Sequence, residues 1–130
     1  MSEGHRQPIV YIDRSDIRPG ALPELRESVA RIVAFIEERE PRLLAYGFHI
    51  DDEASAMTVV AVHPDAASLE LHLRVGGPEF RKVAGLIVLR TIEVYGEPGD
   101  EVLRLLEAKA LALGGASVST HPRTAGFARL

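Results

Sequence analysis

The chain has 130 residues, 46% of them hydrophobic and 26% charged, with a formal charge of −4 and no cysteine. This composition is typical of a globular domain, and the lack of cysteine excludes disulfide bonds, thiolate metal sites and cysteine nucleophiles. The negative charge argues against nucleic-acid and anionic-membrane partners. Because the N-terminus is polar and no apolar run approaches membrane-spanning length, we expect a cytoplasmic protein without a membrane segment.

The first predicted element is a strand, Ile9–Ser15, which follows a polar and loosely ordered end at residues 1–8. Successive side chains of a strand point to opposite faces, so Tyr11 and Asp13 share one face. Arg18-Pro19-Gly20 then predicts a turn.

A long helix is predicted over Leu22–Glu40, because apolar residues recur on one side at helical spacing and a proline follows. Its last residues, Glu37-Glu38-Arg39-Glu40, are interpreted as a solvent-exposed face and not as a metal site. Leu43–Asp51 and Met57–Val62 are predicted as strands joined by a polar connector, so they form a hairpin. Tyr46 lies on the more apolar face of the first of these two strands.

A sharp corner follows the hairpin, because His63-Pro64 ends the strand and Asp65 is suited to cap a helix over Ala66–Val75. His72 lies beside the apolar stripe of this helix, at the boundary between the core and a pocket or solvent. Gly76-Gly77-Pro78 closes the helix, with glycine suiting a left-handed cap.

The remaining segments predict a short helical piece at Pro78–Leu86, with Phe80 as a core anchor, and a strand at Val88–Tyr95. A break rich in glycine and proline precedes a helix at Glu101–Leu113, capped by Asp100, and Ala116–Thr120 predicts a short edge strand.

This order predicts an α+β fold of the ferredoxin-like βαββαβ kind over residues 9–96, with a C-terminal helical extension over 97–130, as one domain. Such a sheet carries helices on a single face, so its other face needs a cover. We expect a homodimer with the two sheets packed face to face, which is a dimeric α/β barrel. The alternative is a monomer whose C-terminal helix covers the sheet.

Three stretches resemble the antibiotic biosynthesis monooxygenase-like family: the opening strand with its Pro-Gly turn, LLAYGFHID, and PDAASLELHLRVGGPEF, with Leu69, His72, Leu73 and Phe80 as matches. Many family members carry a tryptophan nine residues before the histidine, where this chain has His63. The heme-degrading branch resembles the chain less well, since the place of its iron-binding histidine falls near Ala84, which cannot bind iron.

The resemblance implies a pocket between helices and sheet, reached by Tyr11, Asp13, Tyr46 and His72. There His72 would act as the base that takes a phenolic proton, with Asp13 orienting its imidazole. Tyr11, Tyr46, His63, Phe80 and Arg90 are the candidate substrate-binding residues. A purely structural role at the core boundary is an equally open interpretation for His72. An ion pair in a dimer is an equally open interpretation for Arg90.

The function implied is that of a cofactor-independent monooxygenase acting on a small aromatic, quinol or polyketide-like compound, with no metal and no other cofactor. The alternative is a non-catalytic homodimeric module that binds a small molecule or serves as a structural partner. The fold by itself does not choose between them, because one fold hosts many functions.

Overall fold

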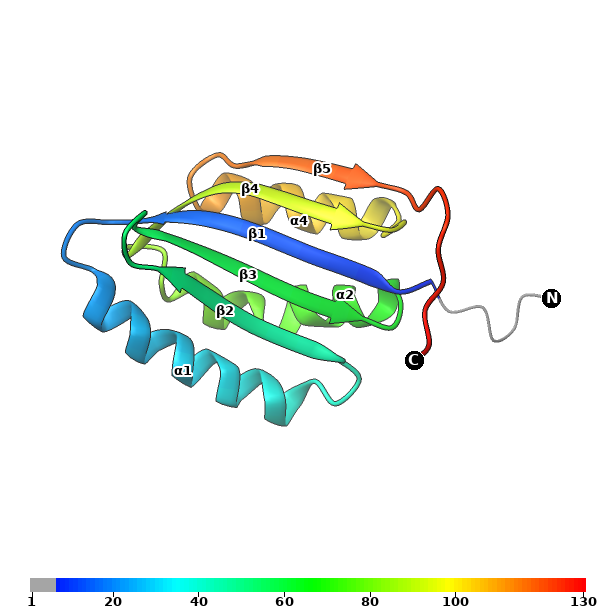
Figure 1. The fold of residues 1–130 in the computed structure, drawn as a ribbon, viewed down its shortest axis with the longest axis horizontal. Helices are drawn as coiled ribbons and strands as arrows, with labels where there is room; N and C mark the ends of the chain where they lie inside the picture. Colours follow the sequence, from blue (N-terminus) through cyan, green and yellow to red (C-terminus); the bar gives the residue numbers. More distant parts are fainter. Residues whose placement is uncertain (1–6) are drawn as a thin grey trace.

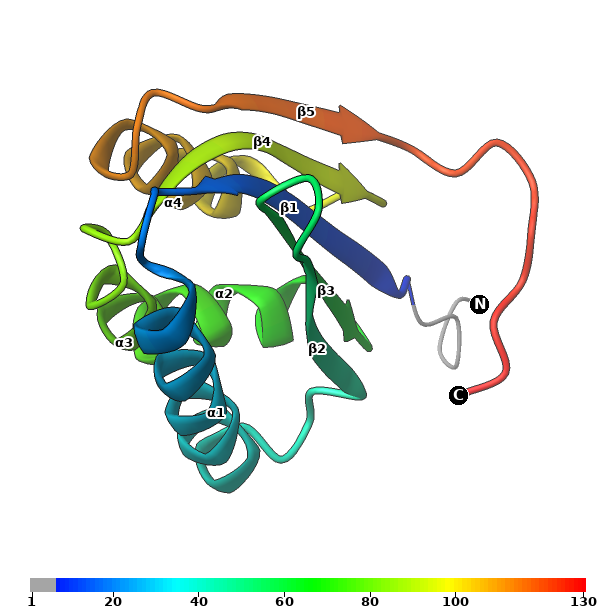
Figure 2. The ribbon, with the colours of Figure 1, turned by 60° about the vertical axis from the view of Figure 1, so that its left-hand side comes forward.

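The computed structural model describes residues 7–130, which form one five-stranded sheet with its helices on a single face (Figures 1 and 2). Most of the expected loose end at residues 1–8 lies outside the described residues. The elements in chain order are β1 (Ile9–Ile17), α1 (Leu22–Arg39), β2 (Ala45–Asp51), β3 (Ala56–His63), α2 (Ala66–Val75), α3 (Gly77–Arg81), β4 (Ile87–Tyr95), α4 (Asp100–Ala112) and β5 (Ser117–His121).

The strand order is β2-β3-β1-β4-β5. The first four strands pair antiparallel and follow the ferredoxin-like arrangement, which confirms the predicted α+β fold and the β2–β3 hairpin. The predicted edge strand also forms: β5 pairs with β4 in parallel, with Ile92 opposite Val118. A parallel neighbour requires a crossover connection, and α4 provides it.

Alternation along the strands divides the sheet into two faces, as the sequence pattern predicts. In β1 the buried residues Ile9, Tyr11 and Asp13 alternate with the half-buried Val10 and Ile12. The first set faces the helices. The second set belongs to the face without helices, which we call the open face.

Helix α4 packs on the helical face of the sheet, next to α2 (Figures 1 and 2). Val102, Leu106 and Ala110 of α4 are buried in the main core. The alternative in which the C-terminal helix covers the open face is therefore wrong. After β5 the chain runs along the end of the molecule as an exposed tail, residues 122–130 (Figure 2).

One of the three helix-end features predicted from the sequence is confirmed, and two differ in the structure. The Asp65 side chain accepts a hydrogen bond from the Ser68 backbone N–H at 3.0 Å, so the predicted cap of α2 is confirmed. The cap of α4 is Gly99, and Asp100 is the first helical residue. Gly76 has φ −82°, not a left-handed value, because α3 follows α2 almost without interruption.

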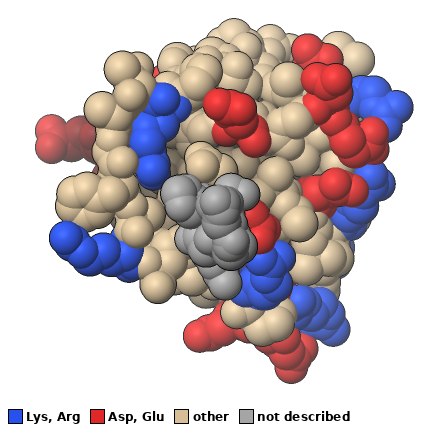
Figure 3. Space-filling model, turned by 90° about the vertical axis from the view of Figure 1, so that its right-hand side faces the viewer, with Lys and Arg blue, Asp and Glu red and all other residues tan. Residues whose placement is uncertain are grey.

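Within residues 7–130 no helix is long and apolar enough to cross a membrane. Figure 3 views the end of the molecule where β1 begins and β4 and β5 end. Acidic and basic side chains are interspersed there.

Candidate functional site

A small cavity of about 10 Å³ lies between the sheet and the helices. This volume is about that of one water molecule. Four of the predicted site residues, Tyr11, Asp13, Tyr46 and His72, come together at this cavity with the predicted Phe80. The full lining consists of Tyr11, Asp13, Tyr46, Val59, His72, Leu73, Gly76, Gly77, Phe80 and Lys109.

His72 is held by a carboxylate that the sequence does not suggest. Its Nδ1 lies 2.9 Å from Oε1 and 3.1 Å from Oε2 of Glu40, and both side chains are buried, with 5% and 4% of each residue exposed. A carboxylate only accepts, so Nδ1 carries the proton and Nε2 is left with its lone pair when the ring is neutral. The expectation that Asp13 orients this imidazole is wrong, because Glu40 does so.

Glu40 lies just past the end of α1, where Pro41 prevents the helix from continuing. The interpretation of residues 37–40 as solvent-exposed is correct for the first three and wrong for Glu40. Gly76 makes room for this residue: a Cβ there would lie 2.6 Å from Cδ1 of Ile36 and 3.1 Å from Oε2 of Glu40.

A second polar group that lines the cavity consists of Tyr11, Asp13 and Lys109. The Tyr11 hydroxyl donates to Oδ2 of Asp13 at 2.5 Å, and Nζ of Lys109 donates to the Tyr11 oxygen at 2.7 Å. Nζ also lies 3.4 Å from Oδ2 of Asp13 and 4.4 Å from the centre of the Phe80 ring. Asp13 is fully buried and Lys109 is 9% exposed, so both charges are almost completely removed from water.

Burial changes the acidity of several of these groups. It raises the pKa of Tyr11 well above its usual value, and the Asp13 carboxylate adds to the effect. Burial also raises the pKa of Tyr46, and the nearby carboxylates of Asp13 and Glu40 raise it further. Burial lowers the pKa of Lys109 in spite of the opposing effect of Asp13. Both tyrosines therefore keep their protons at neutral pH and can donate hydrogen bonds.

His63 lies beside His72, with 5.5 Å between the ring centres, and its Nδ1 is 2.8 Å from Oγ of Ser68. Burial, and secondly His72, lower the pKa of His63 to about 3, so this ring is neutral near pH 7.

Two candidates, His63 and Arg90, are not among the residues that line the cavity. Arg90 is the extra residue of a β-bulge, since Arg14 pairs with Thr91 and Ser15 pairs with Leu89. Its side chain is exposed, and its Nε donates to Oδ2 of Asp16 at 2.7 Å. Arg90 thus has an ion-pair partner within its own chain.

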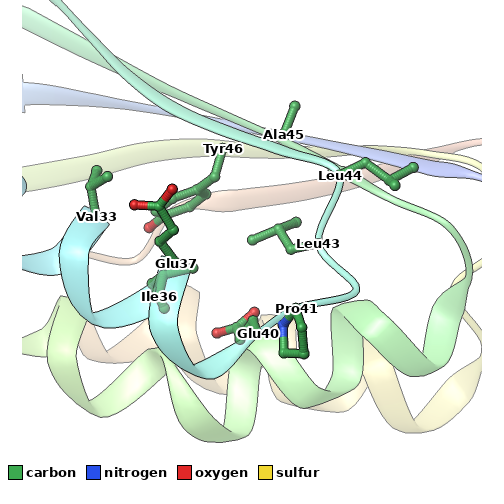
Figure 4. A pocket seen from close by; sticks show the side chains of 9 residues that line it. All are labelled: Val33, Ile36, Glu37, Glu40, Pro41, Leu43, Leu44, Ala45 and Tyr46. Carbon is green, nitrogen blue, oxygen red and sulfur yellow. The ribbon is translucent and has the colours of Figure 1, made fainter.

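A larger cleft of about 320 Å³ lies next to the small cavity, between the end of α1 and the start of β2 (Figure 4). Glu37 and Glu40 approach it from the helix side, and Tyr46 points from β2 toward the helices while Ala45 points away. Glu40 lines this cleft and binds His72, and Tyr46 lines both hollows. Glu40 and Tyr46 thus connect the lining of the cleft to that of the cavity.

Sequence reasoning missed Glu40 and Lys109. A signal existed for Lys109, since it falls on the buried side of α4 with Val102 and Leu106, and lysine is rarely buried without a partner. No comparable signal marked Glu40, which follows an exposed helix end. Within residues 7–130 no three histidine or carboxylate side chains are placed to hold a metal ion.

No protein-family model matches the sequence, and a search of curated proteins finds no match. Solved structures do match. MupZ from Pseudomonas fluorescens is similar over 95% of each chain, with a TM-score of 0.72 and 21% identity. SnoaB, a cofactor-independent oxygenase from Streptomyces nogalater, covers 72% of this chain and 96% of its own, with a TM-score of 0.59 and 18% identity.

A Caulobacter crescentus protein provisionally named an antibiotic biosynthesis monooxygenase covers 68% of this chain and 88% of its own, with a TM-score of 0.53 and 19% identity. The chain thus has the fold of the antibiotic biosynthesis monooxygenase-like proteins, and the resemblance seen in the sequence is confirmed at the level of the fold. Coverage of 95% by MupZ takes in most of residues 97–130, so the likeness extends beyond the ferredoxin-like core.

Proposed function

We propose that the protein is a cofactor-independent monooxygenase whose reaction begins when His72 removes a proton from a hydroxyl group of a small aromatic, quinol or polyketide-like substrate. The observation that carries this proposal is the buried Glu40–His72 pair at the wall of the cavity. Buried ionisable pairs are costly to maintain, and they are found preferentially at functional sites.

The pair is suited to act as a general base. Glu40 accepts a hydrogen bond from Nδ1–H, which fixes the orientation of the ring and directs the lone pair of Nε2 away from Glu40. When Nε2 takes a proton, the nearby carboxylate stabilises the imidazolium that forms. The neutral His63 ring beside it adds no second positive charge.

The chemistry after proton removal needs only the substrate and oxygen. The electron-rich anion reacts with O₂ at an activated carbon, and the peroxide that forms collapses to a carbonyl group and water. One oxygen atom enters the substrate and the other leaves as water. The substrate loses two hydrogens, the hydroxyl proton and the hydrogen of the attacked carbon, and it supplies all four electrons that reduce O₂. The similarity to SnoaB supports this choice of reaction.

The substrate would enter through the cleft between α1 and β2, whose volume of about 320 Å³ suits a small aromatic compound. Tyr46 lines both this cleft and the inner cavity, and in this proposal its ring moves aside to let the reacting group reach His72. In this proposal Tyr46 and Phe80 form the walls that contact the ring of the substrate.

The proposed assembly is a homodimer formed through the open face. Val10 pairs with Val62 and Ile12 pairs with Val60, which places four half-buried aliphatic side chains together at its centre. Exposed apolar patches of this kind favour association with a partner surface. A second copy offers a matching patch by symmetry.

The test is oxygen uptake by the purified protein with a panel of substituted quinols and naphthols, compared among wild type, His72→Gln, Glu40→Gln and the control Glu38→Gln, at an exposed residue that lines neither the cleft nor the cavity. We expect His72→Gln to lower kcat by roughly 10²- to 10⁴-fold. Glu40→Gln should cause a smaller loss, and Glu38→Gln should leave the rate close to that of wild type.

An equal rate in wild type and His72→Gln would overturn the assignment of the base. Binding of the same compounds without oxygen uptake by any form would favour the alternative function, a non-catalytic module that binds small molecules. Circular dichroism of each variant separates loss of turnover from loss of folding.

A further inference from the structure

We infer that the cleft between α1 and β2 takes a cationic substrate, an aromatic hydroxyl compound with a protonated amine on a side chain, and that Glu37 is the residue that recognises the charge. The ammonium group faces Glu37, and the hydroxyl group faces Tyr46 and His72. This inference rests on the proposed function for the use of the cleft, and it adds the charge of the substrate.

The first support is the set of polar groups that line the cleft of about 320 Å³. These groups are two carboxylates, Glu37 and Glu40, and one hydroxyl group, that of Tyr46. The other lining residues are all apolar: Val33, Ile36, Pro41, Leu43, Leu44 and Ala45. Since no basic side chain is among them, a ligand with a carboxylate group would meet only charges of its own sign.

The second support is that Glu37 is free to bind a cation, whereas Glu40 is already bound to His72. Glu37 forms neither a hydrogen bond nor an ion pair within residues 7–130, although the next residue, Glu38, accepts a hydrogen bond from Arg39 at 2.8 Å. In Figure 4 the Glu37 side chain extends from α1 toward β2. The cleft therefore contains one negative charge without a partner in the described chain.

The third support is that the nearest arginines in the chain are directed to other partners. The Arg39 guanidinium pairs with Glu38 and lies 4.2 Å from the centre of the Phe35 ring. Arg42 pairs with Asp65. Neither arginine lines the cleft, so neither neutralises its negative field.

The fourth support comes from the backbone of α1. This helix has 18 residues and ends at Arg39, next to the cleft. The C-terminal end of a helix carries a partial negative charge, because its last carbonyl groups have no partners within the helix. This field adds to that of Glu37, so the position favours a cation over a neutral or negative group.

The two ends of the cleft suit the two ends of such a substrate. Glu37 is exposed at the mouth, whereas Tyr46 is half-buried and also lines the inner cavity beside His72. The Tyr46 hydroxyl group forms no hydrogen bond within residues 7–130, and its raised pKa keeps its proton in place. It can therefore donate a hydrogen bond to the hydroxyl oxygen of the substrate, and the apolar walls accommodate the aromatic ring.

The test compares three probes that share a phenol ring and differ in charge. Tyramine is a cation, 4-ethylphenol is neutral and 3-(4-hydroxyphenyl)propionate is an anion at neutral pH. Their dissociation constants for the full chain are measured by ligand-observed NMR. We expect tyramine to bind about fivefold more tightly than 4-ethylphenol, the upper range for a partly exposed ion pair, and the propionate to bind most weakly. Added salt should reduce the preference for tyramine.

The matched variants are Glu37→Gln, Glu37→Lys and Glu38→Gln, which all change exposed side chains. Glu37→Gln should bind tyramine and 4-ethylphenol with nearly equal affinity, because the charge that distinguishes them is gone. Glu37→Lys should prefer the propionate. Glu38→Gln is the control, since Glu38 does not line the cleft, and it should keep the wild-type order of affinities.

A wild-type protein that binds the three probes equally, that prefers the propionate, or that binds none of them at millimolar concentration would overturn the inference. So would a Glu37→Gln variant with the wild-type order. Because binding is measured and not turnover, the two proposals fail separately. The expected order without oxygen uptake keeps the cationic selectivity and removes the oxygenase. Oxygen uptake that depends on His72 and is fastest with anionic phenols removes the selectivity and keeps the base.

Discussion

His72 and Glu40 are 32 residues apart in the chain, and yet Nδ1 of the imidazole lies 2.9 Å from the carboxylate. This contact joins α2 to the end of α1, and it lies between the surface cleft and the inner cavity. Gly76 lies against both residues, since the missing Cβ would be 3.0 Å from the His72 carbonyl oxygen and 3.1 Å from Oε2 of Glu40. The pair depends on this close approach of the two helices.

Gly76→Ala is expected to destabilise the protein by roughly 1–3 kcal/mol, the usual cost of overpacking a core. The backbone at φ −82° accepts alanine, so the cost comes from the contact at 2.6 Å with Cδ1 of Ile36. Urea unfolding measures the change. The exposed Gly85→Ala is the control: a Cβ there meets nothing within 4 Å, and its effect should be neutral or slightly stabilising. Equal effects of the two substitutions would contradict this account.

Acid should unfold the protein in part through His63. Its pKa falls from 6.5 to about 3 in the folded state, mainly because of burial and secondly because of His72, while Asp65 opposes the shift. Between these two pH values the unfolded chain binds a proton at His63 that the folded chain does not bind. His63 therefore costs no stability above about pH 6.5, and it lowers the free energy of unfolding as the pH falls toward 3, by on the order of 5 kcal/mol in total.

Urea unfolding of wild type and His63→Gln at several pH values from 7 to 4 measures this effect. The variant should show a shallower loss of unfolding free energy over that range. His49→Gln, which changes an exposed histidine, should keep the slope of wild type. If wild type and His63→Gln lose stability in parallel, His63 does not titrate in the way described.

The proposed homodimer predicts that a charge at the centre of the open face separates the subunits. Val60→Asp should convert a species of twice the chain mass of 14.2 kDa into the monomer, as measured by light scattering after size-exclusion chromatography. Leu111→Asp is the control, because Leu111 lies on α4 with 81% of its surface exposed. A wild-type protein that is monomeric at high concentration would refute the dimer.

Much of the fold follows from local pattern. The alternation in β1 and β3 predicted which side chains face the helices, and it placed Tyr11 and Asp13 on that face because strand residues two apart must share a side. Asp65 and the His63-Pro64 corner predicted where α2 begins for similarly local reasons, and His72 then follows at the edge of its apolar stripe.

The partners of these residues were decided by tertiary structure. Glu40 is in a run of charged residues that otherwise faces solvent, and only the packing of α1 against α2 buries it beside His72. Arg90 is directed to the open face by a bulge in the β1–β4 pairing, a register shift that alternation within one strand cannot reveal.

The sequence by itself determined the order of strands and helices, the two faces of the sheet and the position of His72, because these depend on neighbours within a few residues. Only the tertiary structure decided that Glu40 holds His72 and that Lys109 reaches Tyr11 and Asp13, almost a hundred residues earlier in the chain. A buried charge is stable only when distant elements bring it a partner, and that requirement leaves no periodic signal in the sequence.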